Sequence, residues 1–289
     1  MNVTVIGPGR AGTNIAAALV RSGHRVTDAA GGSQASRDEF SRHIAGVRMH
    51  ADALDAVTGA DLVLVATPDD RIEYVVDELA AADRLRAGIK VVHVAGAKGT
   101  EVLRRARLAG ARVAACHPAQ TMPSGAPDPD QLVGVSWAVS AAPADQQWAH
   151  QLVTDLGGTP VDIGDDDRVL YHAALTVGSN AVGAAVAVAR QLLMATGVAE
   201  PGDFLRGLVN ASARNILDRG AVALTGPVVR GDTGTLAAHL DRLDDELPQL
   251  AADYRRLMAV VLSRARPNME GRAAHAVDQL LGEVAAPGQ

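Results

Sequence analysis

The sequence predicts an α/β fold in which a doubly wound parallel-sheet domain at the N-terminus is followed by an all-helical C-terminal domain. Three observations support this class: short apolar runs alternate with helical patterns in the first half, a glycine motif follows the first run, and no strand pattern remains beyond about residue 165. Repeated strand and helix units form one sheet with helices on both faces. We therefore predict a sheet domain at residues 1–163 and a helical domain at residues 164–289.

The strands of the first domain are predicted by short apolar runs that end in Gly, Pro or Thr, as buried parallel strands do. Five such runs occupy residues 2–7, 24–30, 61–67, 90–96 and 112–118. Helical patterns lie between them, for example at residues 11–22 and 72–82. A further strand pair is expected at residues 134–141 and 159–164, with a helix at residues 144–156 between the two strands.

The helical domain contains a long apolar seam. Apolar residues recur there at alternating spacings of four and three, which is typical of one helix face: Leu236, Leu240, Leu243, Leu247, Leu250, Tyr254, Leu257 and Val261. Pro248 is expected to restart the helix, because proline suits a first helical turn. We favour packing within the chain over a coiled coil. A homodimer that uses part of this seam is a further alternative.

Between the domains, residues 169–189 form an uncharged run of 21 residues that nevertheless carries four polar side chains. Their spacing of four, three and one places them in one stripe on a helix: His172, Thr176, Ser179 and Asn180. About 20 apolar residues suffice to cross a membrane, but here one face is polar throughout and Arg190 follows at once. We therefore expect a buried core helix whose polar face lines a ligand site, and no membrane span.

Composition excludes several classes of protein. The net charge of −6 and the absence of a Lys/Arg-rich run give no support for nucleic-acid binding. A single cysteine, Cys116, excludes an internal disulfide and a cysteine-based zinc cage, and we predict no metal site. The N-terminus enters a strand pattern directly, without a signal-peptide pattern, so we expect a cytoplasmic protein.

The glycine motif G-x-G-x-x-G, formed by Gly7, Gly9 and Gly12, lies directly between the first strand and the first helix. Gly7 permits a tight turn, Gly9 lets the backbone approach a pyrophosphate, and Gly12 lets the helix pack closely on the strand. The N-terminus of the helix then faces the anion, with Arg10 and Ala11 in the same turn. This context predicts a dinucleotide-binding site.

The end of the second strand indicates which dinucleotide is expected. An NAD site places an acidic residue about 20 positions after the glycines, at the end of the strand. Asp28 has that spacing, but two alanines follow it, so we expect Asp28 inside the strand. The following loop offers Ser33, Ser36 and Arg37 instead, and hydroxyls with a guanidinium suit a 2′-phosphate. The sequence therefore favours NADP; the alternative is that Arg37 is a solvated helix residue.

Two later strand ends are expected to border the nicotinamide, because ligands of such sheets bind outside the carboxyl ends of the strands. One is residues 66–70, at the end of the third apolar run, with Thr67 and Pro68, and the other is residues 94–99, at the end of the fourth, with Gly96. Small residues at both positions allow a cofactor to approach the backbone closely.

Four motifs together resemble a known family: "GPGRAG", "CHPAQTMP", "YHAALTVGSN" and "LTGPVVRGD". Over nearly its whole length the chain resembles Rossmann-like proteins with a C-terminal helical domain of formerly unknown function, in the 6-phosphogluconate-dehydrogenase-like superfamily. These proteins are similar to ketopantoate reductases, pyrroline-5-carboxylate reductases and prephenate dehydrogenases. The resemblance implies NADPH-dependent reduction of a small 2-oxo acid, with 2-dehydropantoate to pantoate as the first candidate reaction.

One position departs from the pattern of these enzymes. Ketopantoate reductases and related hydroxyacid dehydrogenases place a lysine four residues before an asparagine on the first long helix. Asn180 matches that asparagine, but Thr176 stands where the lysine is expected. Another group must therefore supply the proton, or the chemistry differs. The alternatives are a reductase or dehydrogenase of an imino acid or a prephenate-like substrate, and an NADP(H)-binding sensor without turnover.

Reduction of a 2-oxo acid needs a hydride donor, a hydrogen-bond or proton donor for the carbonyl oxygen, and a cation for the carboxylate. For the carbonyl oxygen we nominate the stripe His172, Thr176, Ser179 and Asn180, and also His117, which ends a strand in an "HP" loop like that of prephenate dehydrogenases. Arg230 lies in a Gly/Pro-rich loop and is our candidate for the carboxylate, with Thr225 beside it. Asp232 either caps the next helix or orients Arg230. We expect these groups to converge on the redox end of the nucleotide.

Overall fold

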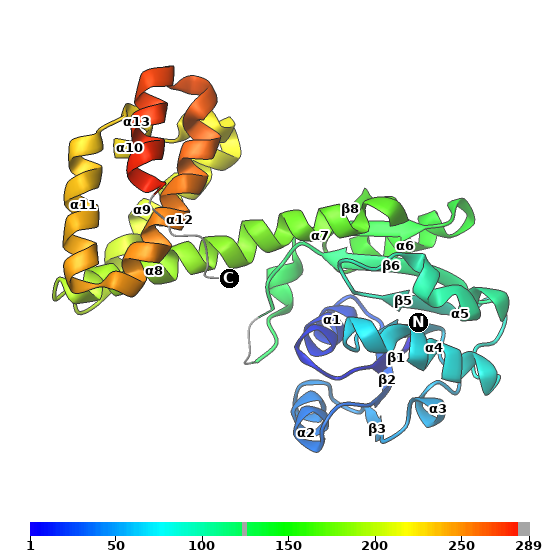
Figure 1. Ribbon diagram of the computed structural model, residues 1–289. Helices are drawn as coiled ribbons and strands as arrows, with labels where there is room; N and C mark the ends of the chain where they lie inside the picture. The colour runs from blue at the N-terminus through cyan, green and yellow to red at the C-terminus, as the bar shows by residue number, and fades with distance from the viewer. Residues whose placement is uncertain (123–125, 283–289) are drawn as a thin grey trace, which may run out of the picture. The chain divides into compact units, whose positions relative to one another are not determined.

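The computed structural model describes residues 1–122 and 126–282 (Figure 1). The chain divides into two compact units, the first at Met1–Val177 and the second beginning at Gly178. All strands of the described residues belong to the first unit, and the second unit is helical. The predicted class, a doubly wound sheet domain followed by a helical domain, is confirmed.

In the described part of the chain, eight strands form one sheet in the order β3-β2-β1-β4-β5-β6-β7-β8. Their bounds are β1 (Asn2–Ile6), β2 (Arg25–Ala30), β3 (Arg48–His50), β4 (Leu62–Val65), β5 (Lys90–His93), β6 (Arg112–Pro118), β7 (Ser136–Ala141) and β8 (Thr159–Asp162). Every neighbouring pair is parallel except β6 and β7, which are antiparallel. The sequence predicts every strand but β3, which is too short to show an apolar run.

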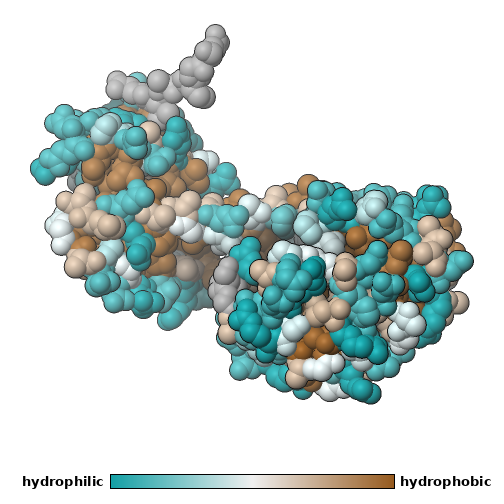
Figure 2. All heavy atoms as spheres, turned by 90° about the horizontal axis from the view of Figure 1, so that it is seen from below, coloured by the Kyte–Doolittle hydropathy of each residue, from teal (hydrophilic) through white to brown (hydrophobic). Residues whose placement is uncertain are grey.

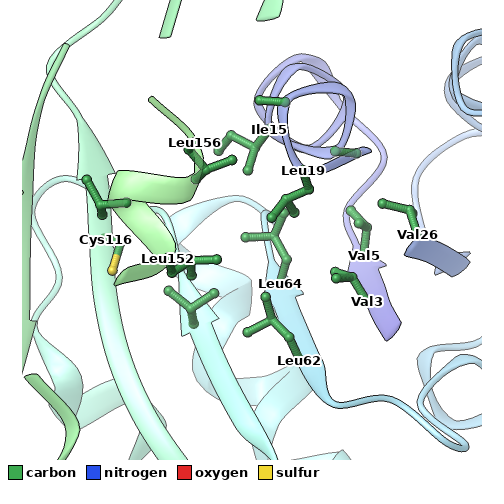
Figure 3. Packing of buried hydrophobic residues seen from close by; sticks show 14 of the residues in the cluster. Val3, Val5, Ile15, Leu19, Val26, Leu62, Leu64, Cys116, Leu152 and Leu156 are labelled. Atoms are coloured by element: carbon green, nitrogen blue, oxygen red, sulfur yellow. The ribbon is translucent and has the colours of Figure 1, made fainter. Parts of the chain in front are cut away.

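Helices cover both faces of the sheet. The helices of the first unit are α1 (Arg10–Arg21), α2 (Gln34–His43), α3 (Ala53–Ala56), α4 (Ile72–Ala81), α5 (Arg104–Leu108), α6 (Pro143–Asp155) and α7 (Arg168–Thr176). Ile15 and Leu19 of α1 and Leu152 of α6 pack on one face of the sheet (Figure 3). On β4, Leu64 belongs to that core and Val65 to the core beneath α4 on the other face. Both faces of the central strands are buried, which explains their continuous apolar runs.

The second unit has its own core. Its helices are α8 (Val182–Ala195), α9 (Pro201–Arg219), α10 (Pro227–Arg230), α11 (Thr233–Glu246), α12 (Pro248–Ala265) and α13 (Gly271–Leu281). Leu236 and Leu240 of the predicted seam are buried against Leu262 of α12 and Val277 of α13. A new helix does begin at Pro248. The prediction that the seam packs within the chain is therefore confirmed.

The central helical segment differs from our expectation of a buried core helix. Residues 165–195 are helical throughout and long and apolar enough to cross a membrane by length and composition, yet none of the most apolar stretch is buried within the chain. Val169, Leu170 and Val177 are 69%, 73% and 65% exposed. The expectation was wrong because apolar composition signals that a surface tends to be covered, without fixing what covers it.

Arg168, the first residue of α7, anchors that helix to the sheet. The side chain is fully buried, and its guanidinium donates hydrogen bonds to the carbonyl oxygens of Ala115 at 2.6 Å, Ala138 at 3.1 Å and Ala95 at 3.3 Å. Its Nε donates to the Ser140 hydroxyl at 2.8 Å. These acceptors lie on β6, on β7 and just after β5, so one side chain joins three strands to α7.

Arg168→Ala should lower the free energy of unfolding by about 3 kcal/mol, because it leaves a cavity and several buried acceptors without a donor. Urea unfolding measures this loss. Arg105→Ala on α5 is the matched control, since Arg105 is exposed, and it should change stability by less than about 0.5 kcal/mol. Equal stability of the two variants would contradict the anchoring role of Arg168.

Candidate functional site

The glycine turn after β1 has the geometry that its motif predicts. Gly7 has φ +99°, and a Cβ there would lie 2.5 Å from the carbonyl oxygen of Ala66. A Cβ on Gly12 would lie 2.2 Å from the carbonyl oxygen of Gly7, so both positions need glycine. At Gly9, by contrast, no atom lies within 4 Å of a built Cβ. The open space is thus at the position where the motif lets a ligand approach the backbone.

The N-terminus of α1 follows this turn directly. Gly9 is its N-cap, and among the described residues no side chain caps the helix. The first amide groups of a helix have no partner within the helix, so those of the first turn, at Arg10, Ala11 and Gly12, are free to bind an anion.

Asp28 is engaged inside β2 and is not at the strand end. Its carboxylate accepts two hydrogen bonds from Arg48, both 2.9 Å long, and lies 2.7 Å from Nε2 of His50. Burial by itself would raise the pKa of Asp28, but the hydrogen bonds to Arg48 and His50 outweigh it and lower that pKa below its usual value. The residues that follow β2 are instead Gly31, Gly32 and Ser33, and none of them carries a carboxylate.

Polar side chains gather at the start of α2. The Ser33 hydroxyl caps this helix by accepting from the Ser36 amide at 3.1 Å. Arg37 folds back over the loop and donates to the Gly32 carbonyl at 2.7 Å. A cavity of about 300 Å³ connects this helix start to the glycine turn, and it is lined by Pro8, Gly9, Arg10, Thr13, Asn14, Ala35, Ser36 and Glu39.

Thr67, two residues after β4, has a buried hydroxyl that makes no hydrogen bond among the described residues. It follows Ala66, whose carbonyl packs against Gly7. Buried hydroxyls are nearly always paired with protein, water or a ligand. A polar ligand bound beside the glycine turn would therefore supply the hydrogen-bond partner that the Thr67 hydroxyl lacks.

His93 fixes the loop that follows β5, and sequence reasoning missed it. The ring is fully buried, the Ala95 amide donates to its Nδ1 at 3.2 Å, and its Nε2 lies 2.9 Å from the Gly99 carbonyl. Nδ1 accepts and Nε2 donates, so the ring is neutral. Burial lowers the pKa of His93 to about 4. The only signal in the sequence is a histidine within an apolar run.

His117 and His172 meet at Gly96, in the loop that His93 holds. Their ring centroids are 5.9 Å apart in an edge-to-face arrangement. A Cβ on Gly96 would lie 2.3 Å from the His172 ring and 3.1 Å from Nε2 of His117, so only glycine leaves room for both rings. Nδ1 of His117 lies 2.9 Å from the Tyr171 hydroxyl. Burial, and then the charges of His172 and Arg168, lower the pKa of His117 to about 4.

The remaining predicted residues lie apart from this cluster or outside its unit. The Thr176 hydroxyl donates to the His172 carbonyl at 2.9 Å. A π-helical turn at Val177–Ala181 interrupts the regular helix assumed for the polar stripe, and within it Ser179 donates to the side chain of Asn180. Ser179 and Asn180 belong to the second compact unit. Pro123, the last residue of the "CHPAQTMP" motif, lies outside the described residues.

Arg230 lies on the short helix α10 and not in a loop, which corrects our expectation. Pro227 begins this helix because proline favours a first turn. The Arg230 side chain is 64% exposed, and its guanidinium lies 3.8 Å from the Asp232 carboxylate. Asp232 caps α11 by accepting from the Thr235 amide at 3.0 Å. Thr225 is exposed, just before α10.

Comparison with known families agrees with this architecture. Residues 1–118 match the model of the Rossmann-like domain, and residues 135–260 match that of a domain of unknown function, DUF2520. The chain joins a Rossmann-like domain to a DUF2520 domain. This pairing confirms the predicted resemblance to Rossmann-like proteins with a helical domain of formerly unknown function. No curated protein matches the sequence significantly.

Solved structures with the same fold include three with known or assigned chemistry. A Bacteroides fragilis protein classed provisionally as an NADP oxidoreductase is 21% identical, with a TM-score of 0.76 over 90% of this chain and 97% of its own. Plasmodium falciparum pyrroline carboxylate reductase, with NADP bound, is 10% identical, with a TM-score of 0.58 over 97% and 98%. A Streptomyces aurantiacus imine reductase is 19% identical, with a TM-score of 0.60 over 97% and 99%. At these identities the likeness shows the fold.

The stability of the first unit should fall as the pH falls from about 6.5 to about 4. The pKa of His93 and that of His117 are both about 4 in the folded state and about 6.5 when unfolded, so the unfolded chain binds more protons in this range. His93→Gln should flatten the pH dependence of the free energy of unfolding, measured in urea at pH 7, 6 and 5. His275→Gln, at an exposed position of α13, should leave that dependence unchanged. Identical slopes for all three proteins would refute the assignment to His93.

Proposed function

We propose that the chain is a cytoplasmic NADP(H)-dependent reductase of a small 2-oxo acid, with 2-dehydropantoate as the first candidate substrate. One observation carries this proposal: the glycine turn after β1, the Gly96 loop after β5 and His117 at the end of β6 all lie at the carboxyl edge of one sheet. Ligands of doubly wound sheets bind at this edge, beside the point where the strand order reverses, here between β1 and β4.

The residues at this edge fit a dinucleotide. Gly7, Gly9, Arg10, Ala11 and Gly12 would hold the pyrophosphate, since Gly9 is open and the amides of the α1 N-terminus are free. Thr67, Pro68 and Gly96 would border the nicotinamide, where the unpaired Thr67 hydroxyl offers a hydrogen bond.

The start of α2 supports NADP over NAD. Asp28 is committed to Arg48 and His50, so the strand end presents no carboxylate for a ribose 2′-hydroxyl. Ser33 and Arg37 stand there instead, on a helix start whose amides attract anions. The NADP held by the Plasmodium falciparum relative agrees with this choice.

The histidines suit the chemistry at the carbonyl group. When bound, the reduced nicotinamide supplies a hydride, whose two electrons form the new C–H bond. The carbonyl oxygen then needs a hydrogen-bond donor while negative charge develops, and afterwards one proton. Nε2 of His117 and the ring of His172 make no hydrogen bond among the described residues and are available for this work. From the sequence alone, Asn180 remains our candidate for orienting the substrate, by its resemblance to the family asparagine, and Arg230 our candidate for the carboxylate, by its Gly/Pro-rich surroundings.

Exposed apolar side chains of the second unit support a homodimer. Phe204 and Leu208, one turn apart on α9, are 68% and 66% exposed, and apolar patches are visible on the surface in Figure 2. Monomers rarely expose large contiguous apolar surfaces. We propose that a second copy of the chain covers this surface.

Steady-state assays of NADPH oxidation with 2-dehydropantoate, other 2-oxo acids, cyclic imino acids and prephenate (prephenate also with NADP) test the proposed activity. We expect turnover of a 2-oxo acid with NADPH. Arg37→Ala should raise KM for NADPH about tenfold and leave KM for NADH unchanged, because it removes a charged partner of the 2′-phosphate. Arg42→Ala, on the next turn of α2, is the control and should change neither. Tight NADPH binding without turnover of any of these substrates would overturn the proposed reductase activity.

Sedimentation equilibrium at micromolar concentration tests the dimer. The wild-type chain should have twice the mass of a monomer, and Phe204→Glu with Leu208→Glu should have the monomer mass, because buried carboxylates are strongly disfavoured in an apolar interface. Leu108→Glu, at a residue of α5 that is 70% exposed, should stay dimeric. A wild-type chain that sediments as a monomer would exclude this interface.

A further inference from the structure

Tyr171 links α7 to His117, and neither the sequence analysis nor the proposed reaction uses it. Its hydroxyl lies 2.9 Å from Nδ1 of His117 and 3.4 Å from the His117 carbonyl. The rings meet edge to face, with centroids 5.8 Å apart. Arg168 holds the helix one turn earlier, so the position of Tyr171 relative to the end of β6 is fixed by the sheet.

The hydroxyl proton of Tyr171 decides which nitrogen of His117 carries hydrogen. If Nδ1 of His117 donated to the hydroxyl, the Tyr171 proton would be left with the carbonyl at 3.4 Å, a longer and weaker hydrogen bond. If Tyr171 donates to Nδ1, both groups are satisfied at 2.9 Å. In that arrangement the ring proton of neutral His117 is on Nε2, the nitrogen beside Gly96.

The surroundings of His117 keep the ring neutral. The ionisable groups near it are Tyr171, His172 and Arg168 of α7 and His93 of β5. Among the described residues none of these groups is a carboxylate that would stabilise an imidazolium, and Arg168 is a buried cation. Cys116, next in sequence, is buried, and burial raises the pKa of its thiol to about 12, so it also brings no negative charge.

We propose that Tyr171 is a positioning residue that holds His117 as an Nε2–H donor, and that this donor makes the site select carbonyl substrates over iminium substrates. An N–H donor stabilises the negative charge that develops on a carbonyl oxygen during hydride transfer. A protonated iminium nitrogen instead presents its own N–H, so the two donors would face each other without an acceptor. The selection rests on the proposed reductase function. It distinguishes this site from the imine-reducing chemistry of the Streptomyces aurantiacus relative.

Two measurements on the full chain test the proposal. Long-range ¹H–¹⁵N correlation spectra of the histidine rings report which nitrogen carries the proton, and wild-type His117 should show Nε2–H with Nδ1 as an acceptor. NADPH-dependent kcat and KM for the preferred 2-oxo acid and for a five-membered cyclic imino acid report the selection. We expect kcat/KM for the imino acid to be at least about 100-fold lower, in line with the cost of losing one oxyanion donor.

Tyr171→Phe should lower kcat for the 2-oxo acid severalfold with little change in KM, because the donor is then present in only part of the molecules. The ratio of imino acid to oxo acid turnover should rise, and the His117 spectrum should show mixed tautomers. Tyr254→Phe is the matched control, since the Tyr254 hydroxyl lies 2.8 Å from Nδ1 of His239 in the same edge-to-face arrangement within the second unit. It should change neither the rates nor the His117 spectrum.

The outcomes of these experiments distinguish the role of Tyr171, the substrate selection and the proposed reductase function. A wild-type His117 with its proton on Nδ1, or an unchanged kcat in Tyr171→Phe, would overturn the role of Tyr171. Equal turnover of imino and oxo acids would overturn the selection while leaving an NADPH-dependent reductase. Absence of turnover on either substrate would overturn the proposed function and with it the selection, and the wild-type spectrum would still decide the role of Tyr171.

Discussion

The buried guanidinium of Arg168 is the constraint on which the candidate site depends. In the described part of the chain its hydrogen-bond partners are carbonyl oxygens just after β5, on β6 and on β7, together with the Ser140 hydroxyl, and none is a carboxylate. A side chain bonded to several strands at once fixes both the position and the rotation of α7. Residues three and four positions later on a helix lie on the same side, so Tyr171 and His172 are brought to the end of β6, where His117 lies.

The same geometry gives the sheet edge an unusual chemistry. Three histidines and one arginine lie close together there, and burial favours the neutral form of His93 and of His117. Neutral imidazoles donate one hydrogen bond each without bringing a full charge into a poorly solvated site. Such donors suit an oxygen that gains negative charge. In the proposed reaction they would do the work of the lysine that is missing at Thr176, from the edge of the sheet.

Much of the sheet domain follows from the sequence, because its signals are local. The glycine spacing, the apolar runs and the two alanines after Asp28 predict the turn, the strands and the buried carboxylate. Arg168, His93 and Tyr171 were missed because their partners are backbone carbonyls or a side chain 54 residues away, which no local pattern reveals. The burial of residues 169–189 was predicted wrongly for a related reason. Apolar composition shows that a helix face tends to be covered, whereas the covering surface depends on contacts between distant segments or separate chains.

A crystal structure of the chain with NADP and the 2-hydroxy acid product tests the central claim most directly, since it shows which protein atoms surround the reacting carbon and oxygen. We expect the product hydroxyl oxygen to lie about 2.6–3.2 Å from Nε2 of His117, with the nicotinamide ring against the Gly96 loop and the Tyr171 hydroxyl still bonded to Nδ1. A nicotinamide ring bound away from Gly96, or a product oxygen held by other groups while Nε2 of His117 faces protein or solvent, would contradict it.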